Sequence, residues 1–274
     1  HIVASTFHSL VGQACHWAKL PHPHESNWDR FNESAPDLLL DAINIIRSPG
    51  SEAEDKLFDA ILVDEAQDFE ETWWIPVRDM LKEPETGVLY VFFDDNQSIY
   101  NQIADIPMET PPFVLNENCR NTQAIHKALV PYISTGEPIV CNGPEGRAVE
   151  NLPVGEGKSA ADVLKSALLM MVDQQGIPPE DIIILTPRSQ KRSQWDNDQQ
   201  LGTLILTWNM DTEMSRAIRV CSIYSFKGLE SPVIVLTEMD QVRDEISDQL
   251  VYVGLSRARN AVGVIGDMPD PTET

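Results

Sequence analysis

A pair of adjacent carboxylates, Asp64 and Glu65, is the feature of this sequence most able to do chemistry. Both follow directly after the short apolar run 60–63, which has the composition of a buried strand. A strand that ends in two carboxylates suits a magnesium–nucleotide site, because the first can hold the metal through its water shell and the second can orient or deprotonate an attacking water. The alternative is that both side chains only cap the next helix, where acidic groups complement the helix dipole.

A second carboxylate pair, Asp94 and Asp95, follows the apolar run 88–93 in the same way. Ligands of open parallel sheets bind beyond the carboxyl ends of the strands, so the polar residues after each run are the candidates for a site. Clustered carboxylates can also hold paired cations, and a two-metal nuclease that uses both pairs is therefore an alternative.

The only tight basic cluster follows the apolar run 181–186 and comprises Arg188, Lys191 and Arg192. We expect these side chains to contact the phosphates of a nucleic-acid backbone, and the alternative is a solvated helix face. The cluster stands out because the chain has 20 Lys and Arg against 43 Asp and Glu, a net charge of −23. Such acidity argues against a protein that coats duplexes, but it leaves room for an enzyme with a narrow nucleic-acid track.

The elements that must position these residues are short apolar runs without polar alternation, which predict strands buried on both faces. The runs lie at 60–63, 88–93, 181–186, 219–223, 232–236 and 261–266. Helices are expected between them, at 72–81, 159–172 and 245–259. Buried strands that alternate with helices indicate parallel α/β units.

The Pro-rich stretch 106–112 is typical of a linker or sharp turn, and it divides the chain into predicted domains 1–110 and 111–274. The first domain holds 6 basic and 21 acidic side chains, whereas the second holds 14 and 22. With 274 residues, of which 42% are hydrophobic, the chain is long enough for two ordinary domains, each with a core.

Four widely spaced cysteines fit a reducing compartment, so we expect a cytoplasmic protein. No run of about 18 apolar residues could cross a bilayer. The first residues lack both a signal peptide and a starting Met, and we therefore expect the chain to be a piece of a longer one.

The stretch 64–68, Asp-Glu-Ala-Gln-Asp, resembles motif II, the Walker B variant, of superfamily 1 helicases of the UvrD/PcrA/Rep type. Further matches follow in that family's order. Thr6-Phe7-His8-Ser9 resembles motif Ib, 93–100 resembles motif III, 115–121 resembles motif IV, 222–230 resembles motif V and 251–259 resembles motif VI. The resemblance covers essentially the whole chain.

The resemblance implies an α/β fold of two RecA-like domains of the P-loop NTPase type, the first truncated at its N-terminus. It also implies the motor core of an ATP-dependent DNA helicase or translocase, with ATP and Mg²⁺ as cofactors. In this family, ATP hydrolysis at the cleft between the two domains drives movement on single-stranded DNA, usually 3′ to 5′. The implied partners are single-stranded or partly duplex DNA and other domains of the parent chain, and no membrane is implied.

The matched motifs assign roles at the ATP site. Asp64 would hold Mg²⁺ and Glu65 would be the catalytic base, while Gln97 would sense the γ-phosphate or the attacking water. Arg120 and Arg257 would neutralise charge that develops on the γ-phosphate, which contributes roughly 10³–10⁵ in rate in related enzymes. The alternative for each arginine is a surface ion pair in an acidic protein.

Other contacts follow from the same motifs. Gly228 would allow close backbone approach, and Glu230 would hydrogen-bond the nucleotide ribose. Thr6, Phe7 and His8 would lie on a turn after an opening strand and touch single-stranded DNA. The remaining DNA candidates are Tyr100, which could stack on a base, and Tyr224, Ser225 and Lys227. Phe7 and Tyr100 could instead be ordinary core aromatics.

The sequence departs from the family in several places. Asn101 and Gln102 stand where the family commonly has Arg and a base-stacking Trp, so the contacts with DNA are expected to differ in detail. Tyr224 stands where His is usual. The interval between Arg120 and Tyr224 is too short for the large inserted domain, called 2B, of the best-known relatives.

The largest departure is that no G-x-x-x-x-G-K-[ST] loop occurs, although this loop cradles the phosphates in such enzymes. Gly155-Glu156-Gly157-Lys158-Ser159 imitates its end, but position 152 is Leu where the first Gly belongs, and we expect Lys158 and Ser159 to begin a surface helix. We therefore expect a fragment that lacks the Walker A segment and is inactive as an ATPase by itself. A non-catalytic, degenerate helicase module that binds a partner or nucleic acid is the other alternative.

Overall fold

The computed structural model describes residues 2–21, 28–97, 111–133, 138–242 and 244–271. The chain folds into two compact units, which we call unit 1 and unit 2. Of the described residues, those up to Asp94 and also Pro111 belong to unit 1, whereas 95–97 and those from Pro112 onward belong to unit 2. Among the described residues, the predicted domain 1–110 therefore differs from unit 1 at 95–97 and at Pro111. None of the helices in the described ranges is long and apolar enough to cross a membrane.

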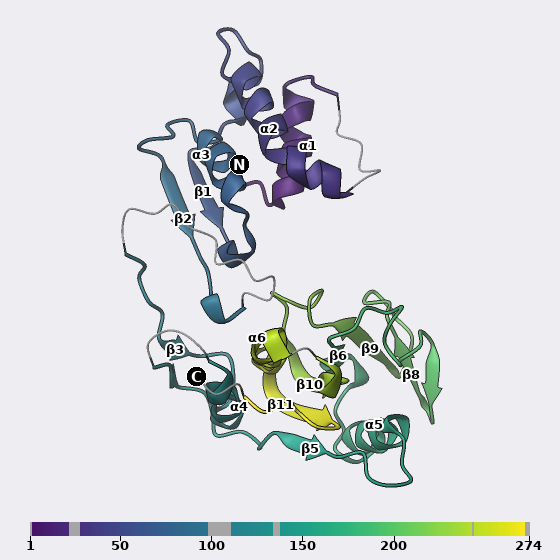
Figure 1. Cartoon of the computed structure of the whole chain (residues 1–274). Helices are drawn as coiled ribbons and strands as arrows, with labels where there is room; N and C mark the ends of the chain where they lie inside the picture. Colours follow the sequence, from purple (N-terminus) through teal and green to yellow (C-terminus); the bar gives the residue numbers. More distant parts are fainter. Residues whose placement is uncertain (1, 22–27, 98–110, 134–137, 243, 272–274) are drawn as a thin grey trace. The chain divides into compact units, whose positions relative to one another are not determined.

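Unit 1 packs three helices against one face of a two-stranded parallel sheet (Figure 1). The helices are α1 (Phe7–Trp17), α2 (Trp28–Ile46) and α3 (Trp74–Asp79), and the strands are β1 (Ala60–Val63) and β2 (Val88–Val91). Short 3₁₀ turns lie at Glu54–Lys56, Ala66–Asp68 and Glu71–Trp73. The predicted helix at 72–81 is therefore formed by the last of these turns and α3.

The prediction that the strands of unit 1 are buried on both faces is wrong. Val63 is buried in the helical core, and Ile61 packs against that core, but Leu62 is 67% exposed and its cross-strand partner Tyr90 is 60% exposed. The reason is that α1, α2 and α3 contribute to a single core cluster on the Val63 side of the sheet. Parallel sheets usually have both faces covered, so the apolar composition of these strands could not indicate which face lies open.

Unit 2 is an α/β unit, as predicted, built around a mostly parallel seven-stranded sheet. All neighbouring strands are parallel except β7 and β8, which form an antiparallel pair. The strand order is β5 (Glu150–Leu152), β11 (Ala258–Ile265), β10 (Ser231–Thr237), β6 (Ile182–Thr186), β9 (Ala217–Ser222), β8 (Leu204–Thr207) and β7 (Gln199–Leu201). The two central strands, β6 and β10, are almost completely buried, which confirms the prediction from their apolar runs.

Helices cover both faces of this sheet. One core cluster joins the sheet to α4 (Gln123–Leu129) and α6 (Asp244–Ser256), and a second joins it to α5 (Ala160–Leu169) (Figure 1). Alternate residues of β6 enter the two clusters: Ile183 and Leu185 enter the first, and Ile182 and Ile184 enter the second. Smaller elements of unit 2 are β3 (Glu117–Asn118), β4 (Val140–Cys141), a π-helical turn at Met170–Gln174, and 3₁₀ turns at Asp95–Gln97, Val130–Tyr132, Pro179–Asp181 and Met239–Gln241.

The segment that imitates a phosphate loop is a helix start, as predicted. Ser159 caps α5: its Oγ accepts from the amide of Asp162 at 3.2 Å, while the Asp162 carboxylate accepts from the amide of Ser159 at 3.1 Å. This reciprocal capping box satisfies two amides that the first turn of a helix leaves without partners. Leu152, at the place of the first Gly of such a loop, ends the strand β5.

Candidate nucleotide and nucleic-acid site

The carboxylates of unit 1 lie at the carboxyl end of β1. Asp64 is exposed, and its Oδ1 accepts from the amide of Glu65 at 3.0 Å. Glu65 has a φ of 52°, a left-handed conformation that costs a non-glycine residue about 1–3 kcal/mol and is most common at functional sites. It stands at the N-cap of the 3₁₀ turn Ala66–Asp68, but its side chain makes no capping hydrogen bond there.

Gln67 holds the Glu65 carboxylate, and it is a residue without a predicted role. The side-chain amide of Gln67 donates to Glu65 Oε2 at 2.6 Å, and its carbonyl accepts from the amide of Asp94 at 3.0 Å. Gln67 is buried, and it therefore links the residues that follow β1 to those that follow β2. The available signal was its place in Asp-Glu-Ala-Gln-Asp, two residues after the predicted base.

Gln97 is the point in unit 2 at which three of the motif-like stretches meet. Its Oε1 accepts from Nη2 of Arg257 at 3.0 Å, and its backbone carbonyl accepts from Nζ of Lys227 at 2.8 Å. Gln97 itself is buried. Three residues that the resemblance placed in motifs III, V and VI are thus brought together, although Lys227 was expected to contact DNA.

Arg257 is only 1% exposed, so the interpretation of this residue as a surface ion pair is wrong. Its Nε donates to the carbonyl of Val253 at 3.3 Å and to Ser256 Oγ at 3.2 Å. The predicted helix at 245–259 ends earlier than expected, at Ser256, because β11 begins at Ala258. The arginine therefore occupies the joint between a helix and a strand, where its backbone is fixed on both sides.

Asn121 fixes that joint and is a second residue without a predicted role. Its Nδ2 donates to the carbonyls of Ser256 and Ala258, at 3.2 and 2.6 Å, on either side of Arg257. Its Oδ1 accepts from Nδ2 of Asn118 at 2.9 Å. The stretch assigned to motif IV therefore positions the arginine of motif VI through the backbone.

Arg120 and Glu230 pair with each other. Nε of Arg120 lies 3.1 Å from Glu230 Oε2, and Nη1 of Arg259 lies 3.7 Å from Glu230 Oε1. All three side chains are about half exposed, and such pairs contribute about 0–1 kcal/mol. The surface ion pair that we considered for Arg120 therefore describes its state in this structure. Gly228 has a φ of 80°, which favours glycine and permits the turn before Glu230.

The motif Ib residues lie on a helix, and the expectation of a turn after an opening strand is wrong. Thr6 caps α1 by accepting from the amide of Ser9 at 3.3 Å. Phe7 is buried, and its ring stacks on Trp73 with centroids 4.2 Å apart, so it is a core aromatic and we withdraw it as a DNA contact. His8 is half-buried, with Nε2 2.7 Å from Asn32 Oδ1.

The other DNA candidates differ in their surroundings. Tyr100 lies outside the described residues. Tyr224 packs against the core cluster that includes α4 and α6, so only part of its side chain is accessible. Ser225 is exposed, and both its amide and its hydroxyl bond to Ser222 Oγ, at 3.1 and 2.8 Å.

The basic cluster lies on a loop that follows β6, so its interpretation as a solvated helix face is wrong. Residues 190–192 form a turn in which the carbonyl of Ser189 accepts from the amide of Arg192 at 2.9 Å. Lys191 and Arg192 are exposed, and Arg188 is half-buried. These cations follow the carboxyl end of a central strand, where ligands of parallel sheets bind.

Residues 217–265 match the family model of the UvrD-like helicase C-terminal domain. The matched segment, about a fifth of the chain, is similar to a UvrD-like helicase C-terminal domain. The predicted resemblance to UvrD-like helicases is thereby confirmed. The matched segment contains Lys227, Gly228, Glu230 and Arg257, and thus two of the residues that meet around Gln97. A search of curated proteins finds no match to the chain.

Solved helicase structures resemble the chain at low sequence identity. One is the C-terminal domain of a possible DNA helicase from Lactobacillus plantarum WCFS1, with 16% identity and a TM-score of 0.36 over 55% of this chain and 88% of that one. Another is the PRRSV helicase, with 15% identity and a TM-score of 0.42 over 86% of this chain and 48% of that one. The chain therefore spans about half the length of the PRRSV helicase. Both TM-scores are below 0.5, so neither structure carries an argument about this chain.

The residues present fit part of a magnesium–ATP ligand. The exposed Asp64 carboxylate suits Mg²⁺, which is usually bound through one or two carboxylates together with waters and phosphate oxygens. The arginine and lysine side chains around Gln97 and Glu230 suit phosphate. The phosphate-cradling loop itself is absent from the 274 residues. Among the described residues, no group of three or more His, Cys, Asp and Glu side chains could hold a metal ion.

Proposed function

We propose that the chain is part of the motor core of an ATP-dependent DNA helicase or translocase, built from two RecA-like domains, that moves along single-stranded DNA in the 3′ to 5′ direction. One observation carries the proposal: Gln97 accepts from both Lys227 and Arg257, within a unit whose residues 217–265 match the UvrD-like helicase C-terminal domain. Bringing an amide and two cations from distant stretches to one point requires a specific fold. Such a group is suited to the negative charge of a polyphosphate.

In this proposal the carboxylates of unit 1 handle the metal and the water. ATP would supply the phosphoanhydride bond that is hydrolysed, and Mg²⁺ would neutralise charge on its phosphate oxygens. Asp64 would hold the metal, and Glu65 would accept a proton from the attacking water at its carboxylate. Gln67 donates to Glu65 Oε2, which fixes the carboxylate and restricts its rotation. General-base groups held in this way contribute about 10²–10⁴ in rate.

The arginines of unit 2 provide positive charge. The guanidinium of Arg257 is desolvated, so its interaction with a phosphate is stronger than it would be in water. Arg120 is held by Glu230 in a half-exposed pair, which contributes only about 0–1 kcal/mol. Arg120 can therefore exchange its carboxylate partner for a phosphate at little cost, and Glu230 becomes available to a ribose hydroxyl.

ATP turnover is proposed for the parent protein and not for these 274 residues by themselves, because their sequence contains no G-x-x-x-x-G-K-[ST] loop. The same observation favours a second candidate, a degenerate helicase module without catalysis that binds nucleic acid or a partner. The motor and a module that binds nucleic acid both predict binding of single-stranded DNA, whereas a module that binds only a partner does not. Only the motor predicts that a parent protein with a phosphate-cradling loop hydrolyses ATP faster when DNA is present.

The test is the DNA-stimulated ATPase activity of the parent protein. Glu65→Gln and Arg257→Ala are each expected to lower kcat by at least about 100-fold. Glu156→Gln and Arg147→Ala are matched controls, because both side chains are exposed on unit 2, and they should leave kcat unchanged. Unchanged turnover in both test variants would overturn the catalytic assignment. A parent protein that binds DNA without any ATPase activity would favour the module instead.

A further inference from the structure

A buried carboxylate lies outside the predicted ATP residues, directly after the central strand β10. Glu238 is 4% exposed and has a φ of 61°, a left-handed conformation that strains a non-glycine residue. A carboxylate is buried only where hydrogen bonds replace its water shell. The partners of Glu238 therefore indicate what it holds.

Three donors converge on this carboxylate. Oε2 accepts from Thr186 Oγ1 at 2.6 Å and from Ser193 Oγ at 2.7 Å, and Oε1 accepts from the amide of Gln194 at 3.0 Å. Thr186 is the last residue of β6, whereas Ser193 and Gln194 lie after the turn that follows it. Glu238 thus joins the two ends of the loop 187–194.

Both hydroxyls also extend the network to the backbone. Thr186 Oγ1 accepts from the amide of Arg188 at 3.1 Å, and Ser193 Oγ accepts from the amide of Trp195 at 3.2 Å. Each hydroxyl donates its own proton to the carboxylate while it accepts from an amide. The amides of Arg188, Gln194 and Trp195 therefore all depend on Glu238, directly or through one hydroxyl. Bonds to an ionised acceptor are stronger than neutral ones, so this network stiffens the loop.

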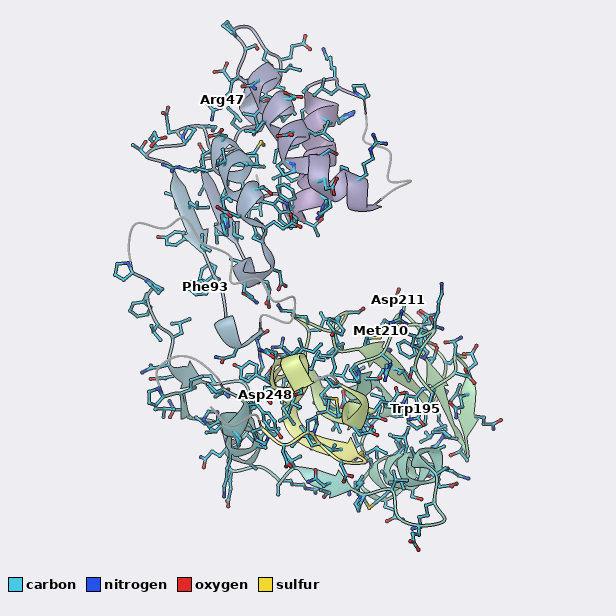
Figure 2. All side chains as sticks on the ribbon, in the orientation of Figure 1. Arg47, Phe93, Trp195, Met210, Asp211 and Asp248 are labelled. Carbon is cyan, nitrogen blue, oxygen red and sulfur yellow. The ribbon has the colours of Figure 1, made fainter. Side chains whose placement is uncertain are left out.

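The far end of the loop is anchored a second time. Trp195, labelled in Figure 2, is buried, and its Nε1 donates to Thr237 Oγ1 at 3.2 Å. Thr237 is the residue before Glu238 and the last residue of β10. Neighbouring residues at the end of one strand thus fix the loop, whereas Lys191 and Arg192 at its tip are exposed.

We propose that Glu238 is a positioning residue that shapes the loop 187–194 so that Arg188, Lys191 and Arg192 contact phosphates of single-stranded DNA. The inference rests on the proposed function for its ligand and adds a residue that does not touch DNA. Fixing the loop before binding removes the entropic cost of ordering three long cationic side chains on a mobile segment. The carboxylate acts through this geometry, since its own charge opposes DNA.

Because the charge of Glu238 opposes DNA binding, a charge effect and a positioning effect predict opposite changes in DNA affinity. Glu238→Gln removes one negative charge from an acidic protein, and by charge alone it should bind DNA more tightly. Positioning predicts the reverse, because an amide in place of the carboxylate cannot accept from all three donors at once. Glu156→Gln is the matched control, since it makes the same charge change at an exposed position of unit 2.

The experiment titrates the 274-residue chain into a fluorescently labelled oligothymidylate and measures Kd by anisotropy over a range of NaCl concentrations. Glu238→Gln should raise Kd about 10-fold and flatten the slope of log K against log[NaCl] by up to about 2, because each of three phosphate contacts contributes about 0.7. Replacing Arg188, Lys191 and Arg192 by Gln should have a similar effect. Adding Glu238→Gln to that triple variant should then change little.

A folding defect is separated from a positioning defect in two ways. Thermal unfolding followed by circular dichroism reports the folded fraction of each variant, and Ser193→Ala removes one donor at the end of the loop while Glu238 stays in place. Ser193→Ala should weaken binding in the same direction, by less than Glu238→Gln. If Glu238 had a purely structural role, the protein that remains folded in Glu238→Gln would show an unchanged slope of log K against log[NaCl]. The loss of affinity caused by Glu238→Gln would then add to the loss caused by the triple variant.

Two results would overturn the inference and can be told apart. If the unsubstituted chain binds oligothymidylate and both Glu238→Gln and Ser193→Ala match it in Kd and slope, the positioning role fails while the proposed function stands. If the unsubstituted chain does not bind, the DNA-binding part of the proposed function fails together with the inference.

Discussion

Nη2 of Arg257 donates to Oε1 of Gln97 at 3.0 Å, joining two buried side chains that are 160 positions apart in the sequence. Their contact gives the proposed ATP site of unit 2 a fixed arrangement, because the carbonyl of Gln97 also accepts from Lys227. Gln97 thus orients two cations at once. Different substitutions of its side chain should therefore have different effects on the free energy of unfolding and on the rate of ATP turnover.

Gln97→Ala should lower the free energy of unfolding by about 1–3 kcal/mol, because it removes a buried acceptor of Arg257. It should also lower the DNA-stimulated ATPase activity of the parent protein at least about 10-fold. Gln97→Glu keeps an acceptor and should retain stability while losing turnover. Urea unfolding and steady-state kinetics measure the two effects. Gln175→Ala, which removes an exposed Gln–Arg hydrogen bond, is the control and should change neither the free energy of unfolding nor the ATPase activity. Full activity of Gln97→Ala would contradict the role of this residue.

Gln67→Leu should lower kcat of the parent protein roughly 10-fold with little change in KM for ATP, because the Glu65 carboxylate loses the donor that orients it. Glu65→Gln, which removes the proposed base itself, should lower kcat by more than Gln67→Leu does. Gln13→Leu on α1 changes the same residue type in unit 1 and should leave kcat unchanged. A variant with raised KM and normal kcat would show that Gln67 supports binding and does not orient the base.

Of the strands in unit 2, β6, β9, β10 and β11 were predicted, most clearly β6 and β10, which are covered on both faces so that nearly every position is apolar. The strands β3, β4, β5, β7 and β8 are too short or too polar to form such continuous runs, and they were not predicted. The same pattern misled in unit 1, where Leu62 and Tyr90 are exposed. Apolar composition reports what a strand can bury, and the packing of the remaining elements determines what it does bury. Helix ends were harder to predict. The helix predicted at 245–259 ends at Ser256, and β11 begins two residues later, at Ala258.

The candidate site could be predicted only in part. The sequence identified the ionisable or polar side chains that lie in motif-like stretches, namely Asp64, Glu65, Gln97 and Arg257. Their supporting residues, such as Asn121, act through hydrogen bonds to backbone carbonyls 135 and 137 positions away, and no local pattern indicates such bonds. Motif matches therefore identified groups that can touch a ligand but missed the groups that hold them in place.

Asn121→Ala should destabilise unit 2 by about 1–3 kcal/mol, because two bonds to the carbonyls beside Arg257 are lost. Asn121→Asp should be more destabilising, since it can place a carboxylate oxygen where those carbonyls now accept from an amide. Urea unfolding of the isolated chain at neutral pH measures both. Asn142→Ala, at an exposed position, is the control. Equal stabilities of the Asp variant and the unsubstituted chain would contradict this hydrogen-bond arrangement.

The four cysteines should differ in their reaction with a maleimide at mildly alkaline pH. Burial raises the thiol pKa of Cys221 and of Cys15, in the latter case with a smaller contribution from Asp41, so both hold less thiolate and are also shielded from the reagent. Cys119 is exposed and should react first. Mass spectrometry of samples quenched over time identifies the order, and labelling in urea provides the reference in which all four react. Faster labelling of Cys15 or Cys221 than of Cys119 would contradict this burial pattern.

Cys119 also offers a probe of the predicted nucleotide site, because it precedes Arg120, whose partner Glu230 is the predicted ribose ligand. In the parent protein, ATP should change the rate of maleimide labelling at Cys119 at least about 2-fold if Arg120 exchanges Glu230 for a phosphate, since the backbone of the neighbouring residue moves with it. Glu230→Gln weakens the pair beforehand and should reduce this ATP effect. An ATP-independent labelling rate in a parent protein that hydrolyses ATP would contradict the exchange of partners by Arg120.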